Sequence, residues 1–450
     1  MLYVDFGMHI QLSEHFTFGK LLKFTFPSIL MMIFTSIYTV VDGIFVSNFV
    51  GKTSFAAVNL VMPILMLCAA FGFMIGSGGS ALVAKFLGEG KKEKANETFS
   101  LLIYFSIIIG ILLATLAFVF MDKIVALLKA DGQLAKDAVF YARIVVICGP
   151  IYILQNLFQS FLIVAERPKM GLALTIAAGL TNMILDALFV GILRWGLMGA
   201  ALATCIAQLI GGIIPLVYFI ISKKSTIRLG KFVWSSYSIF KTCTNGLSEL
   251  VTNIAMSLVS ILYNFQLIKI AGEDGIASFG ALMYVSYIFV SLFLGYGIGS
   301  APIISYHYGA ENTSELKNLF KKDIAIISIS GIAIFVLSEV LTIPLAKIFA
   351  SYDETLFQMI KRAFRLYSFA YLLCGFNIIG SSFFTALNNG IVSAVISFLR
   401  TLVFEVAAIF ILPIFLKLDG IWLSGVAAEV FSFTVTLICI LALRKKYGYF

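Results

Sequence analysis

Long apolar stretches separated by short polar breaks run along almost the whole of this chain. Each stretch reaches the roughly 20 residues that an α-helix needs to cross a bilayer. All are far too long for the alternating strands of a membrane barrel. The pattern therefore predicts an all-α polytopic membrane protein with twelve transmembrane helices. The predicted spans are 20–49, 54–87, 97–121, 137–165, 169–193, 197–221, 240–270, 275–308, 318–347, 359–387, 391–416 and 420–443.

The two halves of the chain resemble each other at one sequence separation. Gly78 and Gly299 are related by a separation of 221 (299 − 78). The same separation relates Ala56 to Ala277, Gly88 to Gly309, Asn156 to Asn377, Ala165 to Ala386, and Gly199 to Gly420. We therefore predict two six-helix lobes related by an internal repeat, at 1–221 and 239–450, joined by a basic cytoplasmic linker at 222–238. Lobes of this kind share one membrane orientation and suit transport by alternating access.

Composition and charge fit a membrane protein. Hydrophobic residues make up 60% of the chain and charged residues 12%, whereas a soluble domain is about a quarter charged. The net charge of +9 lies mainly in the breaks, so it indicates orientation rather than nucleic-acid binding and predicts cytoplasmic termini. The six cysteines are scattered and there are three histidines, so we expect neither disulfides nor a structural metal site. We also expect no cleaved signal peptide.

Two acids stand out because ionisable residues inside an apolar span are costly and usually functional. Asp42 and Asp186 have apolar neighbours on both sides, and Asn182 lies one helical turn before Asp186. Residues four apart share a helix face, so we expect Asn182 to support the Asp186 carboxylate. Two carboxylates close together in an apolar lobe can exchange a proton near neutral pH. The pattern predicts a cation-coupling site.

Other residues in the spans have weaker indications. The further acids are Glu249, Glu339, Glu405 and Glu429. Glu339 lies close to the end of its span, so we expect its side chain to reach the membrane surface. The glycines within 72–79 and 295–299 are expected to let helices pack closely. Met31 and Tyr38 are candidates to line a cavity for apolar cations, because methionine repacks easily and aromatic faces attract cations.

Several strings give the chain a wider resemblance. They are FPSIL at 26–30, VDGIFVSNFVG at 41–51, AERPKMG at 165–171, LTNMILDALFV at 180–190, GAALATCIAQ at 199–208 and NGLSELVTN at 245–253. In order and spacing they resemble the multidrug and toxic compound extrusion (MATE) family of prokaryotic type, over about 18–443 of this chain. The resemblance implies two six-helix lobes around a central cleft, which exchange protons or sodium for organic compounds.

The resemblance also implies roles for individual residues. The implied cation-coupling cluster is Asp42, Tyr141, Asn182, Asp186 and Thr204. Sodium is the alternative to a proton at its two acids. Glu249 matches an acid on the seventh helix that is important in other branches. Asn377 is the nearest polar residue where some sodium-linked members have an aspartate on the tenth helix, and Glu405 and Glu429 are candidates to replace that acid.

These features predict a secondary active multidrug efflux transporter rather than an enzyme. The sequence has no metal-ligand cluster, no nucleophile–base pair and no GxxxxGK[ST] phosphate loop, so we expect no cofactor beyond an ion gradient. One alternative is a flippase of lipid-linked saccharides or lipids from the same superfamily. Another, of a different class, is a membrane enzyme or receptor-like protein. We expect a monomer in the bacterial cytoplasmic membrane that carries small organic, mainly cationic compounds.

Overall fold

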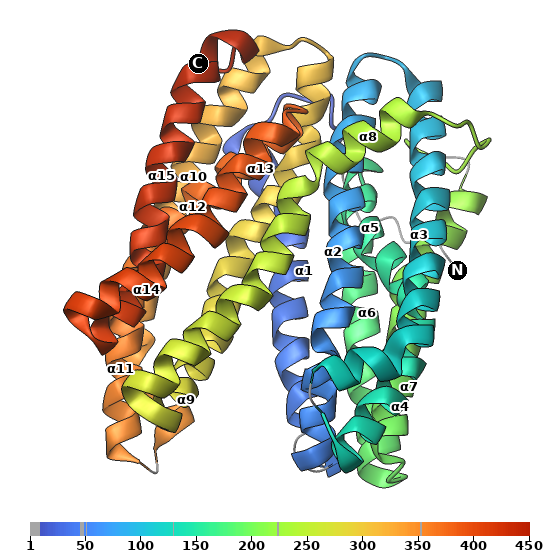
Figure 1. The fold of residues 1–450 in the computed structure, drawn as a ribbon. Helices are drawn as coiled ribbons and strands as arrows, with labels where there is room; N and C mark the ends of the chain where they lie inside the picture. The colour runs from blue at the N-terminus through green and yellow to red at the C-terminus, as the bar shows by residue number, and fades with distance from the viewer. Residues whose placement is uncertain (1–9, 46–48, 51, 129, 223–224, 352) are drawn as a thin grey trace.

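The computed structural model describes residues 10–45, 49–50, 52–128, 130–222, 225–351 and 353–450, apart from the side chains of 39, 40, 42–45, 52 and 55. Helices make up almost all of the described chain (Figure 1). In order they are α1 (Phe18–Phe45), α2 (Lys52–Gly88), α3 (Lys92–Leu127), α4 (Gly132–Ile147), α5 (Gly149–Val164), α6 (Pro168–Asp186), η2 (Ala187–Ile192), α7 (Gly196–Ile221), α8 (Ser236–Asn245), α9 (Leu247–Gly309), α10 (Thr313–Ala350), α11 (Glu354–Tyr367), η3 (Ser368–Ala370), α12 (Tyr371–Ala386), α13 (Gly390–Phe398), η4 (Leu399–Phe404), α14 (Glu405–Leu416) and α15 (Leu418–Tyr447).

The described residues contain twelve membrane spans. Ten stretches are long and apolar enough to cross a membrane, and the α4–α5 pair, bent by 56°, is the eleventh. α9 counts twice, because its 63 residues would form a straight helix about 95 Å long, some three times the hydrocarbon thickness. At Gly272 the backbone has φ 64° and ψ −148°, a conformation open essentially to glycine alone. The chain turns back there, and Tyr263 stacks on Phe279 at 4.5 Å. The predicted number of spans is confirmed.

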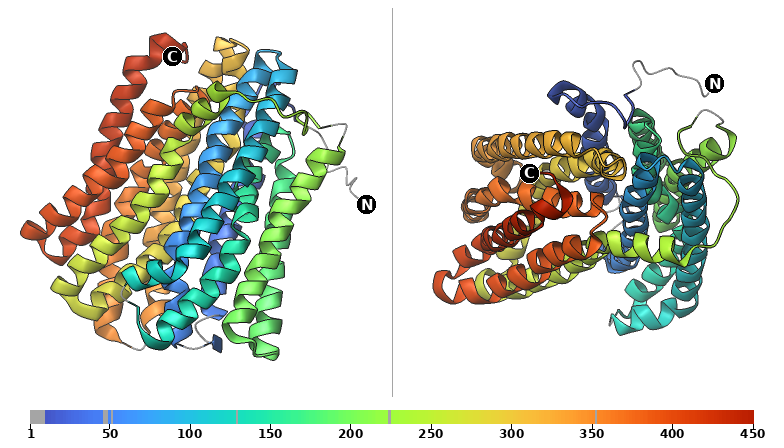
Figure 2. Two further views of the ribbon diagram at one scale, coloured as in Figure 1. Left: turned by 45° about the vertical axis from the view of Figure 1, so that its right-hand side comes forward. Right: turned by 90° about the horizontal axis from the view of Figure 1, so that it is seen from above.

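The seventh span begins later than predicted because a separate short helix precedes it. α8 starts after Ser235, whose side chain accepts a hydrogen bond from Ser238 N at 3.2 Å. This helix lies across one end of the molecule rather than along the spans (Figure 2). α9 then starts at Leu247. The predicted linker and the predicted span 240–270 thus each contain part of α8.

The two halves form bundles that approach each other at the end carrying α8 and diverge toward the opposite end (Figure 1). At the close end, glycines allow contact between α2 and the second arm of α9. A Cβ atom on Gly88 would overlap the backbone oxygen of Tyr306, and one on Gly309 would overlap that of Lys85. Each contact is the other's repeat, because both pairs of equivalent residues are related by the separation of 221. Glycines thus allow close packing of helices between the halves.

A second pair of close contacts obeys the same rule. An added Cβ on Gly78 would lie 2.5 Å from Gly246 N, and one on Gly299 would lie 3.1 Å from Thr25 Cβ. Gly246 corresponds to Thr25 at the separation of 221 (246 − 25), as Gly299 does to Gly78. The interface between the halves therefore has the approximate two-fold symmetry that the sequence repeat predicts.

Turn conformations repeat as well. Glu166 (φ 60°) and Asn388 (φ 57°) are related by a separation of 222 (388 − 166). Arg194 (φ 55°) and Lys417 (φ 51°), after the fifth span of each half, are related by a separation of 223 (417 − 194). Positive φ is uncommon for residues other than glycine. Its recurrence at equivalent turns is independent evidence for the repeat, with a separation that rises from 221 to 223 by the end of the fifth span.

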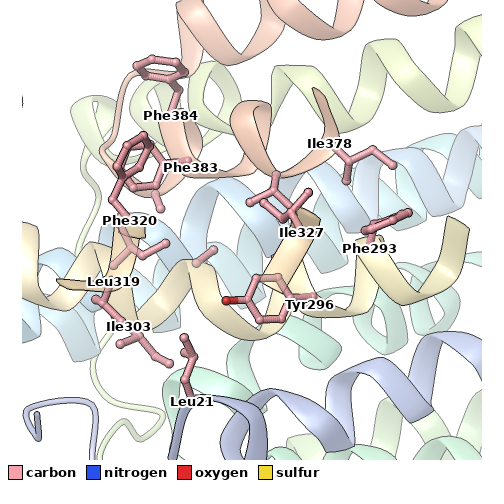
Figure 3. Packing of buried hydrophobic residues seen from close by; sticks show 14 of the residues in the cluster. Leu21, Phe293, Tyr296, Ile303, Leu319, Phe320, Ile327, Ile378, Phe383 and Phe384 are labelled. Atoms are coloured by element: carbon pink, nitrogen blue, oxygen red, sulfur yellow. The ribbon is translucent and has the colours of Figure 1, made fainter. Parts of the chain in front are cut away.

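Each half also sends its leading segment onto the core of the other half. Leu12, Phe16 and Leu21, before and at the start of α1, pack into an apolar cluster built mainly from α9, α10 and α12. Figure 3 shows Leu21 on α1 beside residues of this cluster. In the opposite direction, Ile227 and Leu229 pack among residues of α2, α3 and α5. The halves are therefore joined by exchanged segments as well as by glycine contacts.

The glycine interface gives a direct test. Gly88→Ala should lower the thermal-unfolding temperature of the purified protein in detergent, because relieving the overlap with the Tyr306 backbone would cost about 1–3 kcal/mol. Gly280→Ala is the matched control, since no heavy atom lies within 4 Å of its added Cβ and alanine favours helix. Equal unfolding temperatures for the two variants would contradict the close contact of α2 and α9.

Candidate functional site

One face of α6 carries two of the predicted coupling residues. Asn182 and Asp186 are 3% and 0% exposed, and with Gly179 they follow the spacing of one helix face. That face is turned toward α1, because an added Cβ on Gly179 would lie 3.2 Å from Tyr38 Cδ1. Asn182 Oδ1 is buried and accepts no hydrogen bond from any described residue. A buried polar surface is thus presented to α1.

α1 runs beside α6 in the same direction. Gly171 lies close to Met31, and Gly179, further along α6, lies close to Tyr38. α1 also contacts η2, which follows α6. This register brings the backbone of residue 42, near the end of α1, to the level of the end of α6. The side chain of Asp42 lies outside the described residues.

The other two residues of the predicted cluster lie where α4 meets α7. Cys205 Sγ donates a hydrogen bond to Ile144 O at 3.7 Å. Tyr141 lies one turn before Ile144 and is buried, and Thr204, next to Cys205, is half-buried. α7 also packs against α6. The predicted residues therefore come from four helices that pack together in the first half.

A π-helical segment begins directly after Asp186. η2 has six residues, and the fifth span of the second half contains a segment of equal length, η4, immediately before Glu405. π-helical turns replace the usual i→i+4 hydrogen bonds and occur frequently at functional sites. The two segments are not repeat equivalents, because their starts are 212 positions apart (399 − 187) rather than 221 to 223. Each nevertheless places a weakened hydrogen-bond ladder beside an acid of its own half.

A compensated ion pair lies inside the second half. Arg400 Nε and Nη2 donate to Glu429 Oε1 at 2.9 and 2.8 Å. Asn377 Nδ2 donates to Glu429 Oε2 at 2.6 Å, and Thr436 Oγ1 donates to Asn377 Oδ1 at 2.9 Å. Both carboxylate oxygens of Glu429 are thus engaged, as a buried ion pair requires. Predicted residues Asn377 and Glu429 are brought together here.

Glu405 lies beside this ion pair but is held by a different contact. Tyr263 OH, on α9, donates to Glu405 Oε1 at 3.3 Å. Glu405 is half-buried and begins α14, directly after the segment that contains Arg400. Glu405, Glu429 and Arg400 thus lie near one another in the second half, and Arg400 is bonded to Glu429.

The remaining predicted residues are dispersed. Glu249 lies in the first turn of α9 and is half-buried, and no hydrogen bond or ion pair to its carboxylate is found among the described residues. Met31 is 1% exposed, which makes it a core residue, and Tyr38 is half-buried. Glu339 accepts a hydrogen bond from Ser368 Oγ at 2.7 Å, so its contact is within the protein and not only at the surface.

One buried acid was missed by the sequence reasoning. Asp323 is 2% exposed, and its carboxylate accepts a hydrogen bond from Tyr296 OH. Tyr296 lies among apolar side chains that include Ile327 and Leu319 (Figure 3). Neighbouring lysines at 321 and 322 made Asp323 resemble a surface residue. Helical spacing from Leu319 to Ile327 was the available signal, because it places Asp323 on the buried face.

Comparison with known proteins places these features in context. A family model described as MatE matches residues 27–188 and 250–411, one stretch in each half. The multidrug export protein MepA of Staphylococcus haemolyticus (strain JCSC1435) is 25% identical over 326 residues, covering 71% of this chain and 70% of the relative. MepA of Staphylococcus aureus (strain NCTC 8325 / PS 47) is 22% identical over 435 residues, covering 95% and 94%.

Solved structures share the fold over nearly the whole chain. The crystal structure of MATE in complex with MaL6 superposes with a TM-score of 0.90 at 22% identity, covering 96% of this chain and 98% of that one. The outward-facing conformation of a multidrug resistance MATE family transporter of the MOP superfamily superposes with a TM-score of 0.89 at 23% identity, with the same coverage. Two six-helix lobes are therefore the fold of this chain.

The Arg400–Glu429 pair is expected to stabilise the second half. Glu429→Gln leaves the guanidinium of Arg400 buried without its counter-charge, which should destabilise the protein by about 3–5 kcal/mol. Thermal unfolding measures this loss, and the double variant Arg400→Gln/Glu429→Gln should recover part of it. Asp122→Asn is the control, because Asp122 is 66% exposed in its pair with Arg143 and such pairs contribute at most about 1 kcal/mol. Equal effects at Glu429 and Asp122 would contradict a buried ion pair.

Proposed function

This chain belongs to the MatE family, and on that premise we propose that it is a secondary active multidrug efflux transporter of the bacterial cytoplasmic membrane. In the proposed reaction, small organic compounds, mainly cations, leave the cell while protons or sodium ions enter by alternating access. Relatives named as multidrug export proteins support the substrate class. The observation that carries the coupling mechanism is the buried Asn182–Asp186 face turned toward α1.

The repeat supports a pairing of this face with Asp42. At the separation of 221, Asp42 corresponds to Tyr263; at 223, the separation at the end of the fifth spans, Asn182 corresponds to Glu405. Tyr263 and Glu405 are hydrogen-bonded to each other. We infer by symmetry that Asp42 approaches Asn182 in the first half. Asp186, one turn further along α6, then completes a pair of acids.

Protonation of this pair couples the gradient to the conformation of the lobe. Two carboxylates in an apolar site repel each other, so one binds a proton readily. When the proton leaves, the added buried charge must be accommodated by water or by a change in helix geometry. The π-helical turn after Asp186 offers the place for such a change. The two conformations then differ in proton affinity, which is the requirement for coupling.

Sodium is the alternative coupling ion at the same residues. Hard cations bind oxygen ligands, and this region offers carboxylates, the Asn182 Oδ1 atom, which has no partner among the described side chains, and the hydroxyls of Tyr141 and Thr204. Efflux that depends on sodium at fixed pH would favour this ion, and efflux driven by a pH gradient in sodium-free buffer would favour the proton.

We also propose that the arrangement faces outward, with both termini in the cytoplasm. The bundles meet at the end that carries α8 (Figure 1). Lys85 and Lys446 belong to this end together with Lys241 of α8, since their charges act on Lys241. Basic residues at the membrane ends favour the cytoplasmic side. The lobes are then closed toward the cytoplasm.

The coupling site is tested by Asp42→Asn and Asp186→Asn in proteoliposomes with an imposed pH gradient. Each variant should reduce efflux of a fluorescent organic cation to background, because an amide cannot carry the proton, while equilibrium binding of the cation persists. Asp122→Asn, at an exposed acid, should transport normally. Full gradient-driven efflux by both single variants would refute the coupling role. Scrambling of labelled lipid without dye efflux would instead favour a flippase.

Glu249 is expected to serve the substrate path rather than the fold. Its carboxylate has no partner among the described residues, and its repeat equivalent at a separation of 221 is Ser28. Glu249→Gln should therefore impair efflux of cationic substrates more than that of neutral ones and leave the unfolding temperature unchanged. Normal cation transport by the variant, together with a lowered unfolding temperature, would assign Glu249 a structural role.

A further inference from the structure

The segment before α1, residues 10–17, forms a strap between the two halves. At one end, Leu12 N donates a hydrogen bond to Glu166 Oε1 at 2.8 Å. Glu166 follows α5 in the first half and has φ 60°. At the other end, the strap contacts α10 in the second half. We call residues 10–17 the N-terminal strap.

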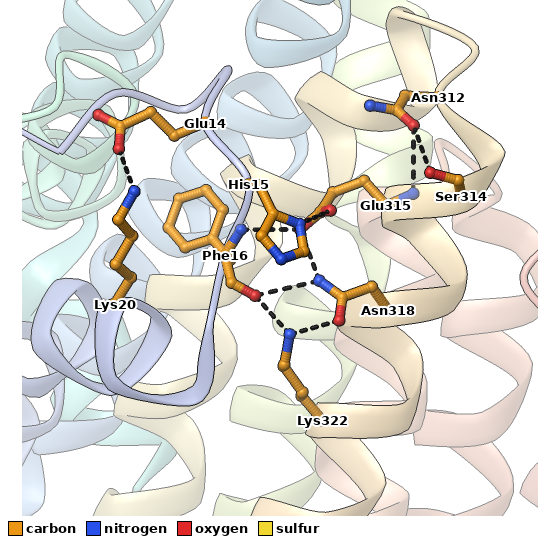
Figure 4. Close-up of polar contacts among 9 residues, drawn as sticks. All are labelled: Glu14, His15, Phe16, Lys20, Asn312, Ser314, Glu315, Asn318 and Lys322. Carbon is orange, nitrogen blue, oxygen red and sulfur yellow. Dashed lines mark hydrogen bonds and ion pairs between the residues drawn. The ribbon is translucent and has the colours of Figure 1, made fainter.

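The contacts of the strap with α10 are numerous and charged (Figure 4). Glu315, 5% exposed in its side chain, accepts from Phe16 N at 2.9 Å and pairs with His15 Nδ1 at 2.6 Å. Asn318 Nδ2 donates to Phe16 O at 3.0 Å, and Lys322 Nζ donates to the same oxygen. Both backbone groups of Phe16 are thus satisfied by side chains of one helix. Hydrogen bonds to charged groups are strong, and several of them join the strap to α10 where one joins it to Glu166, so the α10 end is the firm one.

Apolar burial reinforces the same end. Phe16 is fully buried, with its ring 6.0 Å from Phe24 and 6.5 Å from the ring of His307 on α9. Leu12 is 1% exposed and belongs to the same cluster. Burying two large apolar side chains contributes about 1.5–3 kcal/mol each. The strap is therefore part of the second-half core, although it leads into the first helix of the first half.

Glu166 holds two leading segments at once. Its Oε1 accepts from Leu12 of the strap, and its Oε2 accepts from Thr226 Oγ1 of the linker at 3.3 Å. The linker is docked on the first half in its turn, because Arg228 N donates to Asn96 Oδ1 at 2.9 Å. One side chain in the first half is thus bonded to a segment whose other end is fixed to the second half.

The equivalent turn of the second half also bonds segments across the interface between the halves. Asn388 corresponds to Glu166 at the separation of 222 and also has positive φ. Its backbone oxygen accepts from Lys241 Nζ at 2.7 Å, and its side chain accepts from Asn245 at 2.8 Å and donates to Ala81 O at 3.3 Å. It therefore ties α8 and α2 together. In both halves the turn between the fourth and fifth spans fastens elements that cross the interface.

We propose that the N-terminal strap is a latch that keeps the lobes closed at the α8 end, with Glu315 as its anchor and Glu166 as its releasable catch. The catch is the weaker end, since one backbone hydrogen bond joins the strap to Glu166 where several contacts join it to α10. Separation of the lobes at this end breaks the Leu12–Glu166 bond and leaves the strap on the second half. The latch rests on the proposed alternating access, because it opposes the inward-opening step.

Cys243 is a native reporter for this opening. It lies on α8, is half-buried and packs against the first-half core, so it loses cover when the lobes part. The experiment uses full-length protein in lipid nanodiscs, with Cys68, Cys148, Cys205, Cys374 and Cys439 replaced by alanine. The rate of Cys243 labelling by a polar maleimide is measured without any ion gradient. Glu166→Ala should increase the rate on the order of tenfold, because a hydrogen bond to a charged acceptor is lost from the closed state.

The anchor is tested by Glu315→Ala, which should increase the labelling rate at least as much. Because both variants act through one strap, the double variant should label no faster than the faster single variant. Lys20→Gln is the matched control, since the Lys20–Glu14 pair links the strap only to the first turn of α1, which follows it directly in the chain. That variant should label at the wild-type rate.

Unchanged labelling in Glu166→Ala and Glu315→Ala, or rates that multiply in the double variant, would overturn the latch. Hydrogen exchange distinguishes opening from unfolding: in Glu166→Ala the Leu12 amide should exchange faster while the Phe16 amide and α12 stay protected. Loss of protection throughout α12 in that variant would also overturn the proposal, because it would show general destabilisation. Since no gradient is applied, failure of the latch leaves the proposed coupling at Asp42 and Asp186 intact.

Discussion

Close backbone contact between α2 and the second arm of α9 is the constraint on which the two-lobe arrangement depends. At Gly88 and Gly309 a single methyl group would overlap the main chain of the other half. Interhelical approach this close adds dispersion contacts that lipid tails cannot supply. Since the two positions are repeat equivalents, a glycine at the same place in each half makes the contact symmetric. We call this contact of α2 with the second arm of α9 the seam.

The seam also carries an electrostatic cost. Burial, together with the charges of Lys85 and Lys446, lowers the pKa of Lys241. These lysines come from both halves, so closing this end brings like charges together. The hydrogen bond that Lys241 Nζ donates to the backbone oxygen of Asn388 offsets part of this repulsion. Exchanged segments, anchored through carboxylates, oppose the remaining repulsion. Contact between the halves at this end is thus held by a balance of opposed interactions, which suits the opening that the proposed alternating access requires.

The sequence was sufficient to predict the spans, because these follow from the length of the apolar stretches. It was also sufficient to predict the repeat, because glycines recur at a fixed separation. α8 escaped prediction, since its ten residues mix polar and apolar side chains without a clear period and only Gly246 separates it from α9. Asp323 escaped because its charged neighbours suggested a surface. The Arg400–Glu429 pair and the contact of the strap with Glu315 join residues from different elements, 29 and 299 or 300 positions apart. Such pairings follow from packing geometry that a single sequence does not contain.

The two halves differ chemically at equivalent positions of the repeat. Arg400 corresponds to Ala178 at a separation of 222, and Glu429 to Gln208 at 221, so an ion pair in the second half replaces neutral side chains in the first. Conversely, the first-half acid Asp186 corresponds, at a separation of 223, to Ile409, which is apolar and fully buried. A paired charge resists titration, because neutralising one partner leaves the other buried and uncompensated. A carboxylate on the α6 face has no arginine at the equivalent place. Under the coupling proposed for Asp42 and Asp186, proton exchange takes place in the first half. The Arg400–Glu429 pair is then the fixed charge pair of the second half, where the acids Glu405 and Asp323 are hydrogen-bonded to tyrosines.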